Sequence, residues 1–144
     1  MAPNNYVQQI SVFIENRPGR TCKVLDVLEQ EHINVRGFMI SDTNDYGILR
    51  LVVDQPERGL EVLNRAGYAA KVKPILVARL VDEPGNLSKL LNHLANAHIN
   101  VTYSYSLIST YVAICTSNID EAWQPAVEAG VDLVTLDELV AELV

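Results

Sequence analysis

The stretch His32-Ile33-Asn34-Val35 recurs unchanged as His98-Ile99-Asn100-Val101, 66 residues further along the chain (98 − 32). The same shift carries Pro18-Gly19 onto Pro84-Gly85, and nine of the eighteen positions from Pro18 to Val35 are identical to their counterparts. A repeat of this kind indicates that a structural unit has been duplicated within the chain. We therefore expect two similar domains, residues 1–73 and residues 74–144.

The pattern of apolar and turn-forming residues predicts the same order of elements in both copies. In the first copy, strands are expected at 9–14, 33–40, 48–53 and 68–72, a turn at 41–45, and helices at 21–32 and 56–66. In the second copy, strands are expected at 75–81, 99–108, 111–116 and 131–134, and helices at 87–94 and 119–129. The second copy's first helix has a predicted core stripe of Leu87, Leu90, Leu91 and Leu94. Thr135-Leu136-Asp137-Glu138 has the pattern of a capping box and predicts an extra C-terminal helix.

The order β-α-β-β-α-β is that of the ferredoxin-like α+β architecture, an antiparallel sheet with both helices on one face. A unit of about 70 residues buries a modest share of its surface and is marginally stable alone. Only Lys73-Pro74 separates the predicted last strand of the first copy from the first strand of the second. We therefore expect the two units to pack side by side.

Composition excludes several classes of function. The net charge of −7 and the pI near 4.8 disfavour nucleic-acid and anionic membrane partners, which need Lys and Arg at the contact. No apolar stretch has the length of a membrane span, and the start of the chain lacks the features of a signal peptide, so we expect a cytoplasmic protein. The two cysteines do not fall at equivalent positions and are expected to be small apolar residues in a reduced compartment. No metal-ligand cluster, phosphate-binding loop or catalytic set is recognisable, which predicts neither an enzyme nor a cofactor.

The candidate ligand site is the loop before the first predicted helix of each copy, Glu15-Asn16-Arg17-Pro18-Gly19-Arg20 and Asp82-Glu83-Pro84-Gly85-Asn86. The first turn of a helix exposes unpaired N–H groups and a partial positive charge, which suit a carboxylate. Asn16 has a donor and an acceptor, and Asn34 follows the helix with the same chemistry. These groups fit a free amino acid.

Each feature also has a plainer interpretation. Pro-Gly before a helix is often only a turn, and Asn34 and Asn100 are also suited to closing their helix ends. His32 and His98 suit the negative end of the helix dipole. Trp123 is expected in a core or an interface. Tyr103 and Tyr105 are expected on one face of a sheet, where the acidic charge favours packing over base stacking.

Taken together, the Asn-Arg-Pro-Gly loop, the helix and the following His-Ile-Asn-Val resemble the ACT domain, an amino-acid-sensing module of biosynthetic enzymes. The resemblance covers two copies, about 9–72 and 75–134. Because ACT units usually pair with the ligand between them, it implies ligand contacts from Asn16 and Asn34, with Asn100 as the partner across the interface. It extends the candidate site to Arg17, Pro18, Gly19, Arg20, Val35, Asp82, Glu83, Pro84, Gly85, Asn86, Leu87 and Val101.

Asp82 stands where the first copy has Asn16, and an ionised carboxylate accepts hydrogen bonds without donating them. It favours an ammonium group and repels a ligand carboxylate. The two sites are therefore expected to differ, with the Asn16 loop as the primary one.

The resulting hypothesis is a tandem ACT protein, expected to form a homodimer, that binds a free amino acid and changes its contact with a partner. One alternative is a regulatory subunit of an amino-acid biosynthetic enzyme, such as the small subunit of acetolactate synthase, whose ACT loop is similar. The others are a dimerisation module without a ligand and a nucleic-acid-binding ferredoxin-like domain.

Overall fold

The computed structural model describes residues 3–15, 17–43 and 46–142. The chain divides into two compact units, Gln8–Lys73 and Pro74–Val144, and the latter also includes the N-terminal segment Met1–Val7. Each unit contains one copy of the repeat and has its own apolar core.

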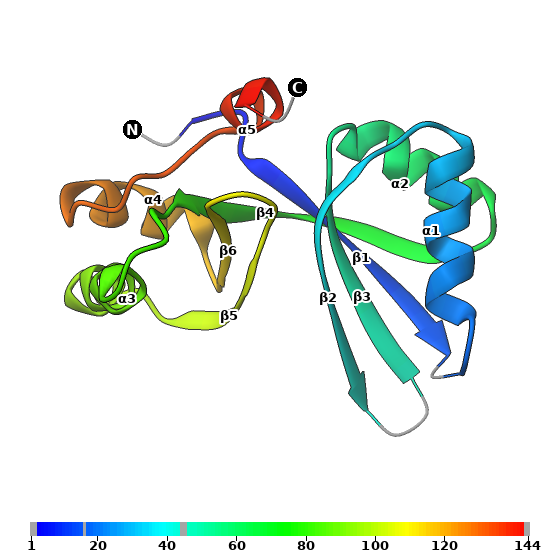
Figure 1. The fold of residues 1–144 in the computed structure, drawn as a ribbon, viewed down its shortest axis with the longest axis horizontal. Coiled ribbons are helices and arrows are strands. Elements are labelled where there is room, and N and C mark those ends of the chain that lie inside the picture. Colours follow the sequence, from blue (N-terminus) through cyan, green and yellow to red (C-terminus); the bar gives the residue numbers. More distant parts are fainter. Residues whose placement is uncertain (1–2, 16, 44–45, 143–144) are drawn as a thin grey trace. The chain divides into compact units, whose positions relative to one another are not determined.

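The first unit contains β1 (Val7–Glu15), α1 (Arg20–Gln30), β2 (Val35–Thr43), β3 (Tyr46–Val53), α2 (Pro56–Arg65) and the beginning of β4 (Ala69–Arg79). Its strands have the order β2-β3-β1-β4. Both helices lie on one face of this sheet (Figure 1). The core lies between the two layers, where alternate residues of β1 and β3 such as Val12 and Leu49 are fully buried. The predicted α+β class and element order are confirmed.

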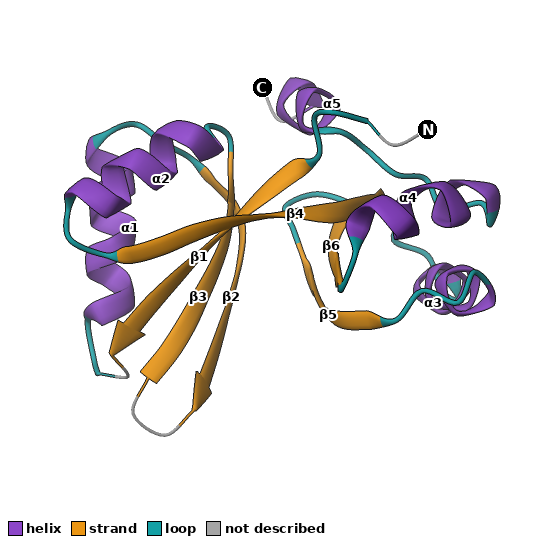
Figure 2. Ribbon diagram, turned by 180° about the vertical axis from the view of Figure 1, so that it is seen from behind, coloured by secondary structure: helices purple, strands orange, loops and turns teal. Residues whose placement is uncertain are grey.

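The second unit contains the end of β4, α3 (Asn86–Asn96), β5 (Val101–Ser106), β6 (Tyr111–Thr116), α4 (Ile119–Glu128) and α5 (Leu136–Glu142). Its strands have the order β4-β6-β5, and α3 and α4 lie together on one face of them (Figure 2). One half of the capping box predicted at Thr135 is formed: Thr135 donates through its N–H and its hydroxyl to Glu138 Oε1 at 3.3 and 3.0 Å, and α5 follows.

Two strand predictions need correction. The strands expected at 68–72 and 75–81 are one continuous strand, β4, which passes through Lys73 and Pro74 without a loop. The strand expected at 131–134 is reduced to one isolated bridge between Leu133 and Ala78. The segment still bonds to β4, from the Arg79 N–H to the Asp132 carbonyl at 2.8 Å and from the Val134 N–H to the Val77 carbonyl at 2.9 Å.

The repeated histidines close the first helix of each copy. His32 and His98 adopt left-handed backbone with φ of 56° and 58°. The following isoleucine N–H bonds five residues back, Ile33 to Leu28 and Ile99 to Leu94, each at 3.0 Å. This arrangement is a Schellman motif. The interpretation of Asn34 and Asn100 as the residues that close these helices is therefore wrong, and both asparagines begin the chain's path into the next strand.

The N-terminal segment is tied to the second unit. The Tyr6 hydroxyl donates to Asp120 Oδ1 at 2.9 Å, and its ring packs edge-on against Trp123 with centroids 5.5 Å apart. The N–H of Leu136 donates to the carbonyl of Asn5 at 3.0 Å. Burial raises the pKa of Tyr6 from 10.0 to about 12, and the hydrogen bond and negative charge of Asp120 contribute to the same shift. Trp123 is therefore an anchor at the edge of the second core, as expected.

The raised pKa predicts a pH dependence of stability that Tyr6→Phe removes. Below pH 10 the phenol is neutral in the folded and unfolded chains. Between pH 10 and pH 12 the unfolded chain loses this proton first, so the free energy of unfolding decreases as pH rises. Relative to Tyr6→Phe, the wild type should lose about 2 kcal/mol across this range in urea unfolding followed by circular dichroism. Parallel profiles for the two proteins would contradict the assignment.

Candidate ligand-binding loops

The loop of the first unit turns into α1 at Gly19. Gly19 has a φ of 84°, a left-handed conformation that suits a residue without a Cβ atom. Arg17 donates its N–H to the carbonyl of Glu15 at 2.9 Å and places its Nε 3.3 Å from the Glu15 carboxylate. Arg20 lies 3.6 Å from the same carboxylate. The loop therefore presents two arginines around one glutamate; Asn16, the principal predicted contact, lies outside the described residues.

The loop of the second unit has the same turn with different charges. Gly85 has a φ of 89° and is the N-cap of α3. Asn86 donates its side-chain amide to the carbonyl of Val81 at 2.9 Å, which closes the loop on itself. Asp82 and Glu83 are exposed and form no ion pair with the residues that the structure describes. This loop is therefore acidic where the first is of mixed charge.

Both helices start with backbone donors that no described side chain caps. In α1 the first N–H, that of Arg20, donates to Arg17, and the helical pattern begins with Lys23 to Gly19. The equivalent bonds in α3 run from Asn86 to Glu83 and from Lys89 to Gly85. Between them, the N–H groups of two residues in each helix have no partner among the described residues: Thr21, Cys22, Leu87 and Ser88. These amides can donate hydrogen bonds to a carboxylate group.

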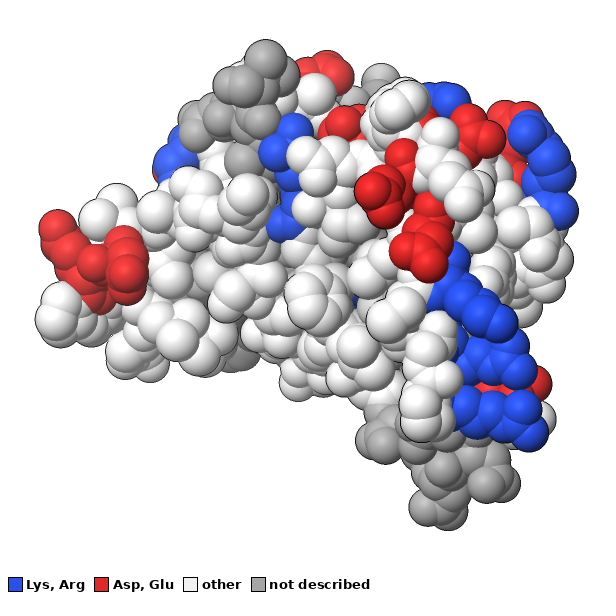
Figure 3. Space-filling model, turned by 45° about the vertical axis from the view of Figure 1, so that its right-hand side comes forward, with Lys and Arg blue, Asp and Glu red and all other residues white. Residues whose placement is uncertain are grey.

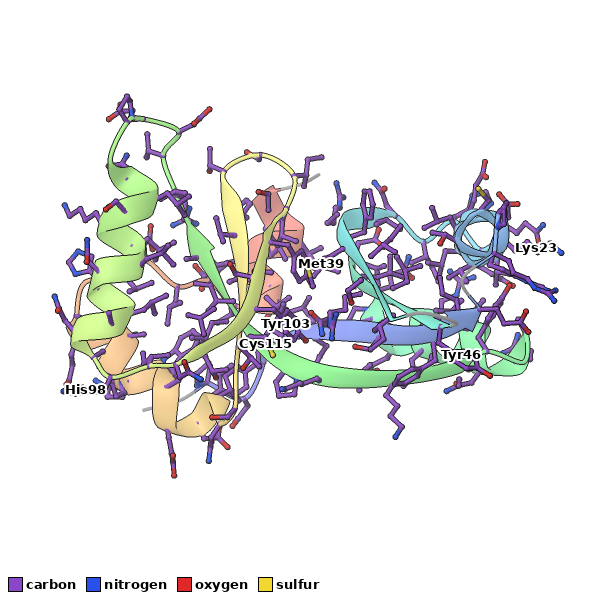
Figure 4. All side chains as sticks on the ribbon, turned by 90° about the horizontal axis from the view of Figure 1, so that it is seen from below. Lys23, Met39, Tyr46, His98, Tyr103 and Cys115 are labelled. Atoms are coloured by element: carbon purple, nitrogen blue, oxygen red, sulfur yellow. The ribbon has the colours of Figure 1, made fainter. Side chains whose placement is uncertain are left out.

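The asparagines of the repeat lie away from the loops of their own units. Asn34 follows the C-terminal end of α1, where its N–H donates to Asp54 Oδ1 at 3.0 Å and its carbonyl accepts from the Asp54 N–H at 3.1 Å. His98, labelled in Figure 4, marks the corresponding end of α3, two residues before Asn100. An eleven-residue helix is about 16 Å long, so one small ligand cannot contact a loop and the asparagine of the same unit. Val35 and Val101 begin their strands beside these asparagines.

A surface depression of about 400 Å³ lies beside the loop of the second unit. Its lining includes Asp82, Glu83 and Leu87 of the predicted site, and it continues over β5 at Ser104 and Ser106. The first loop borders a smaller depression of about 140 Å³, lined by Phe13, Ile14, Glu15, Arg20 and Tyr68. The larger volume lies at the lower end of the range for small-molecule sites.

The predicted core stripe of the second unit is wrong at Leu87 and Leu91. Their side chains are 52% and 43% exposed, whereas Leu90 and Leu94 are buried. Leu87 instead forms one wall of the depression.

Sequence reasoning did not identify the serines of β5 as lining residues. The alternation Tyr103-Ser104-Tyr105-Ser106 contains the signal, because it places the tyrosines on one face and the small polar residues on the other. The tyrosine rings stack at 6.5 Å, as their shared face predicts.

On the face shown in Figure 3, described acidic and basic side chains gather in small groups separated by uncharged surface. Among the residues that the structure describes, no group of three or more His, Cys, Asp and Glu is placed to hold a metal ion. No helix in the described parts of the chain has the length and apolarity to cross a membrane.

A family model described as an ACT domain pair matches residues 5–143. The chain belongs to this family. The match includes both loops and both asparagines of the repeat. The matching family model is that of a domain pair and not of a catalytic family. A comparison with curated proteins found no match.

Solved structures share the ACT pair fold over nearly the whole chain. Protein BT0572 from Bacteroides thetaiotaomicron is 30% identical with a TM-score of 0.86, over 94% of this chain and 96% of that one. The regulatory subunit of aspartate kinase from Thermus thermophilus, in a ligand-free form, is 20% identical with a TM-score of 0.62, over 90% and 96% of the two chains. The corresponding subunit from Thermus flavus is 19% identical with a TM-score of 0.58, over 88% and 94%. The last two show the likeness of fold alone.

The left-handed turn at Gly85 predicts an unusual order of substitution costs. A Cβ atom at Gly85 would meet no atom within 4 Å, so the cost of a side chain comes from the backbone conformation. Gly85→Ala should lower the free energy of unfolding by about 1–2 kcal/mol. Gly85→Asn should cost less despite its larger side chain, because asparagine enters the left-handed region more readily. Denaturant titrations measure both values. A larger cost for asparagine would show that space, and not backbone conformation, limits this position.

Proposed function

We propose that this ACT domain pair is a regulatory protein that binds a free amino acid at its loop sites. The main support is the first turn of α1 after Gly19 and of α3 after Gly85, where two successive backbone N–H groups have no described hydrogen-bond partner. These donors are suited to the α-carboxylate of an amino acid. Nearby carboxylates, Glu15 in one unit and Asp82 in the other, are suited to its ammonium group.

The two loops form unequal sites in this proposal. Arg17 and Arg20 together outweigh the charge of Glu15 at the first loop, so a ligand carboxylate meets a net positive charge there. At the second loop, Asp82 and Glu83 repel a carboxylate, although the depression beside them offers more room. The first loop, with Asn16, is therefore the tighter site and the second the weaker.

Asn34 and Asn100 have a role only across an interface. Because each lies at the far end of its helix, it contacts a ligand only when another unit or another chain brings it to a loop. Exposed apolar side chains support such an assembly. Phe38 and Ile40 of β2 are 57% and 50% exposed, and unburied apolar residues on a strand favour association. We therefore include a homodimer in the proposal.

Regulation requires that the ligand bind one arrangement of units more tightly than another. A ligand held between a loop and an asparagine of another unit meets this condition, because separating the units breaks half of its contacts. The regulated partner in the proposal is an enzyme of amino-acid metabolism. Its support is the likeness of fold to regulatory subunits of aspartate kinase.

A thermal-unfolding screen against the proteinogenic amino acids tests the proposal. At a concentration one hundred times Kd, the correct amino acid should stabilise the protein by about 2.7 kcal/mol, or about 5–10 °C in Tm. Protein refolded from denaturant, and therefore free of retained ligand, is the starting material. A Tm unchanged by every amino acid would favour a dimerisation module without a ligand.

Two matched variants in the same assay test the order of the sites. Asn16→Ala should raise the Kd of the tighter site by tenfold or more, because a removed hydrogen bond to a charged ligand contributes about 1.5–3 kcal/mol. Asp82→Ala should leave that Kd within about threefold, because Asp82 belongs to the other loop. The reverse order of affinities would make the second loop the primary site.

A further inference from the structure

A second depression, of about 180 Å³, lies at the opposite end of α3 from the loop site. It is formed within the second unit by three segments: the end of α3, the end of β6 and the first turn of α4. Its lining includes Ala97, Asn100, Thr116, Asn118 and Glu121. It contains no lysine or arginine.

Thr116, one of the residues that line this depression, carries an unsatisfied and buried polar group. The residue is 5% exposed, and its hydroxyl has no hydrogen-bond partner among the described residues. It faces the helices, because it lies two residues after the fully buried Ile114 on the same strand. Buried hydroxyls without partners are rare in folded proteins, and this one therefore requires an explanation.

In the first unit, an arginine side chain occupies the position that corresponds to this depression. The second helices of the copies align with a shift of 63 residues (119 − 56), because the second hairpin is shorter. Arg58 of the first unit therefore corresponds to Glu121. The Arg58 guanidinium donates to the carbonyl of Glu31 at the end of α1 and to the Glu31 carboxylate, both at 2.8 Å. A cationic group thus occupies the negative end of that helix.

The second unit keeps the acceptors of this site and lacks the cation. Ala97 stands in place of Glu31, and no described group donates to its carbonyl. Glu121 stands in place of Arg58, and its carboxylate forms no described ion pair. Thr116 stands in place of Val53, which is buried and apolar. Three changes between the copies therefore remove a resident guanidinium and leave a carbonyl, a carboxylate and a hydroxyl around an open depression.

We propose that this depression binds the cationic N–H donor group of a small organic molecule, a primary ammonium or a guanidinium. The ligand group replaces the guanidinium that Arg58 supplies in the first unit. Its N–H groups donate to the Ala97 carbonyl, the Glu121 carboxylate and the Thr116 hydroxyl, and the C-terminal end of α3 favours its charge. This site lies at the other end of α3 from the loop and is argued from its own residues, although Asn100 in its lining is also the proposed cross-interface ligand contact.

The test is a titration followed by amide NMR shifts, with ethylammonium and methylguanidinium as probes. At least one probe should give saturable shifts confined to the amides of 97–101 and 116–122. Tetramethylammonium, a cation without N–H donors, and potassium chloride at equal ionic strength should give none. Equal shifts with either control would overturn the proposal in favour of a nonspecific or inorganic cation site, and the absence of saturable shifts with both probes would remove it.

Charge-matched variants locate the binding. Glu121→Gln should raise the Kd of the probe by tenfold or more, whereas Glu128→Gln, the same change at the other end of α4, should leave it unchanged. Thr116→Val should weaken binding while keeping or raising the Tm of the free protein, because it removes the unpaired hydroxyl. Glu121→Arg should abolish binding by restoring the cation of the first copy. Unchanged probe affinity in both Glu121→Gln and Thr116→Val would refute the site. Amino-acid binding at the loops should persist in all four variants.

Discussion

Left-handed backbone at both ends of the first helix in each copy is the constraint on which the rest of the structure depends. Gly19 and Gly85 turn the chain into the helices, and His32 and His98 turn it out. A glycine N-cap carries no side chain that can bond the first-turn amides. The same turn that positions the helix therefore leaves donors open to a ligand. The turns at the far ends direct the repeated asparagines into the next strand.

The two copies share their buried apolar positions and differ in their surfaces. Buried apolar positions of the strands and helices recur in both copies. Several differences lie at the ends of the helices: the loops differ in charge, and the far end of the first helix has a guanidinium in one copy and an open depression in the other. Divergence at helix ends costs little stability, because the residues involved are mostly exposed and most of the core remains intact.

Much of this fold can be predicted from the sequence, because the repeat fixes the element order and apolar spacing fixes the faces of most elements. Four features were not predicted. The strand expected at 131–134 is an isolated bridge at Leu133. Pro74 suggests the end of a strand, yet the backbone of β4 continues through it. Leu87 and Leu91 fit a helical stripe, but no described element covers them. Asn34 resembles a helix stop, while His32 performs that role, because a left-handed histidine has no distinctive pattern in one sequence. The loops could be named from the sequence as candidate sites and remain a proposal, whereas the place of Thr116 beside the second depression required the structure.

The central claim is that the first-turn amides of α1 and α3 hold the ligand's carboxylate. The direct measurement is the amide proton shift of Thr21, Cys22, Leu87 and Ser88 when the amino acid identified by the screen is added to saturation. Hydrogen bonding to a carboxylate should move the signals of at least one of these pairs downfield, by more than those of other amides in the same helix. Binding that leaves all four signals unchanged would contradict the account.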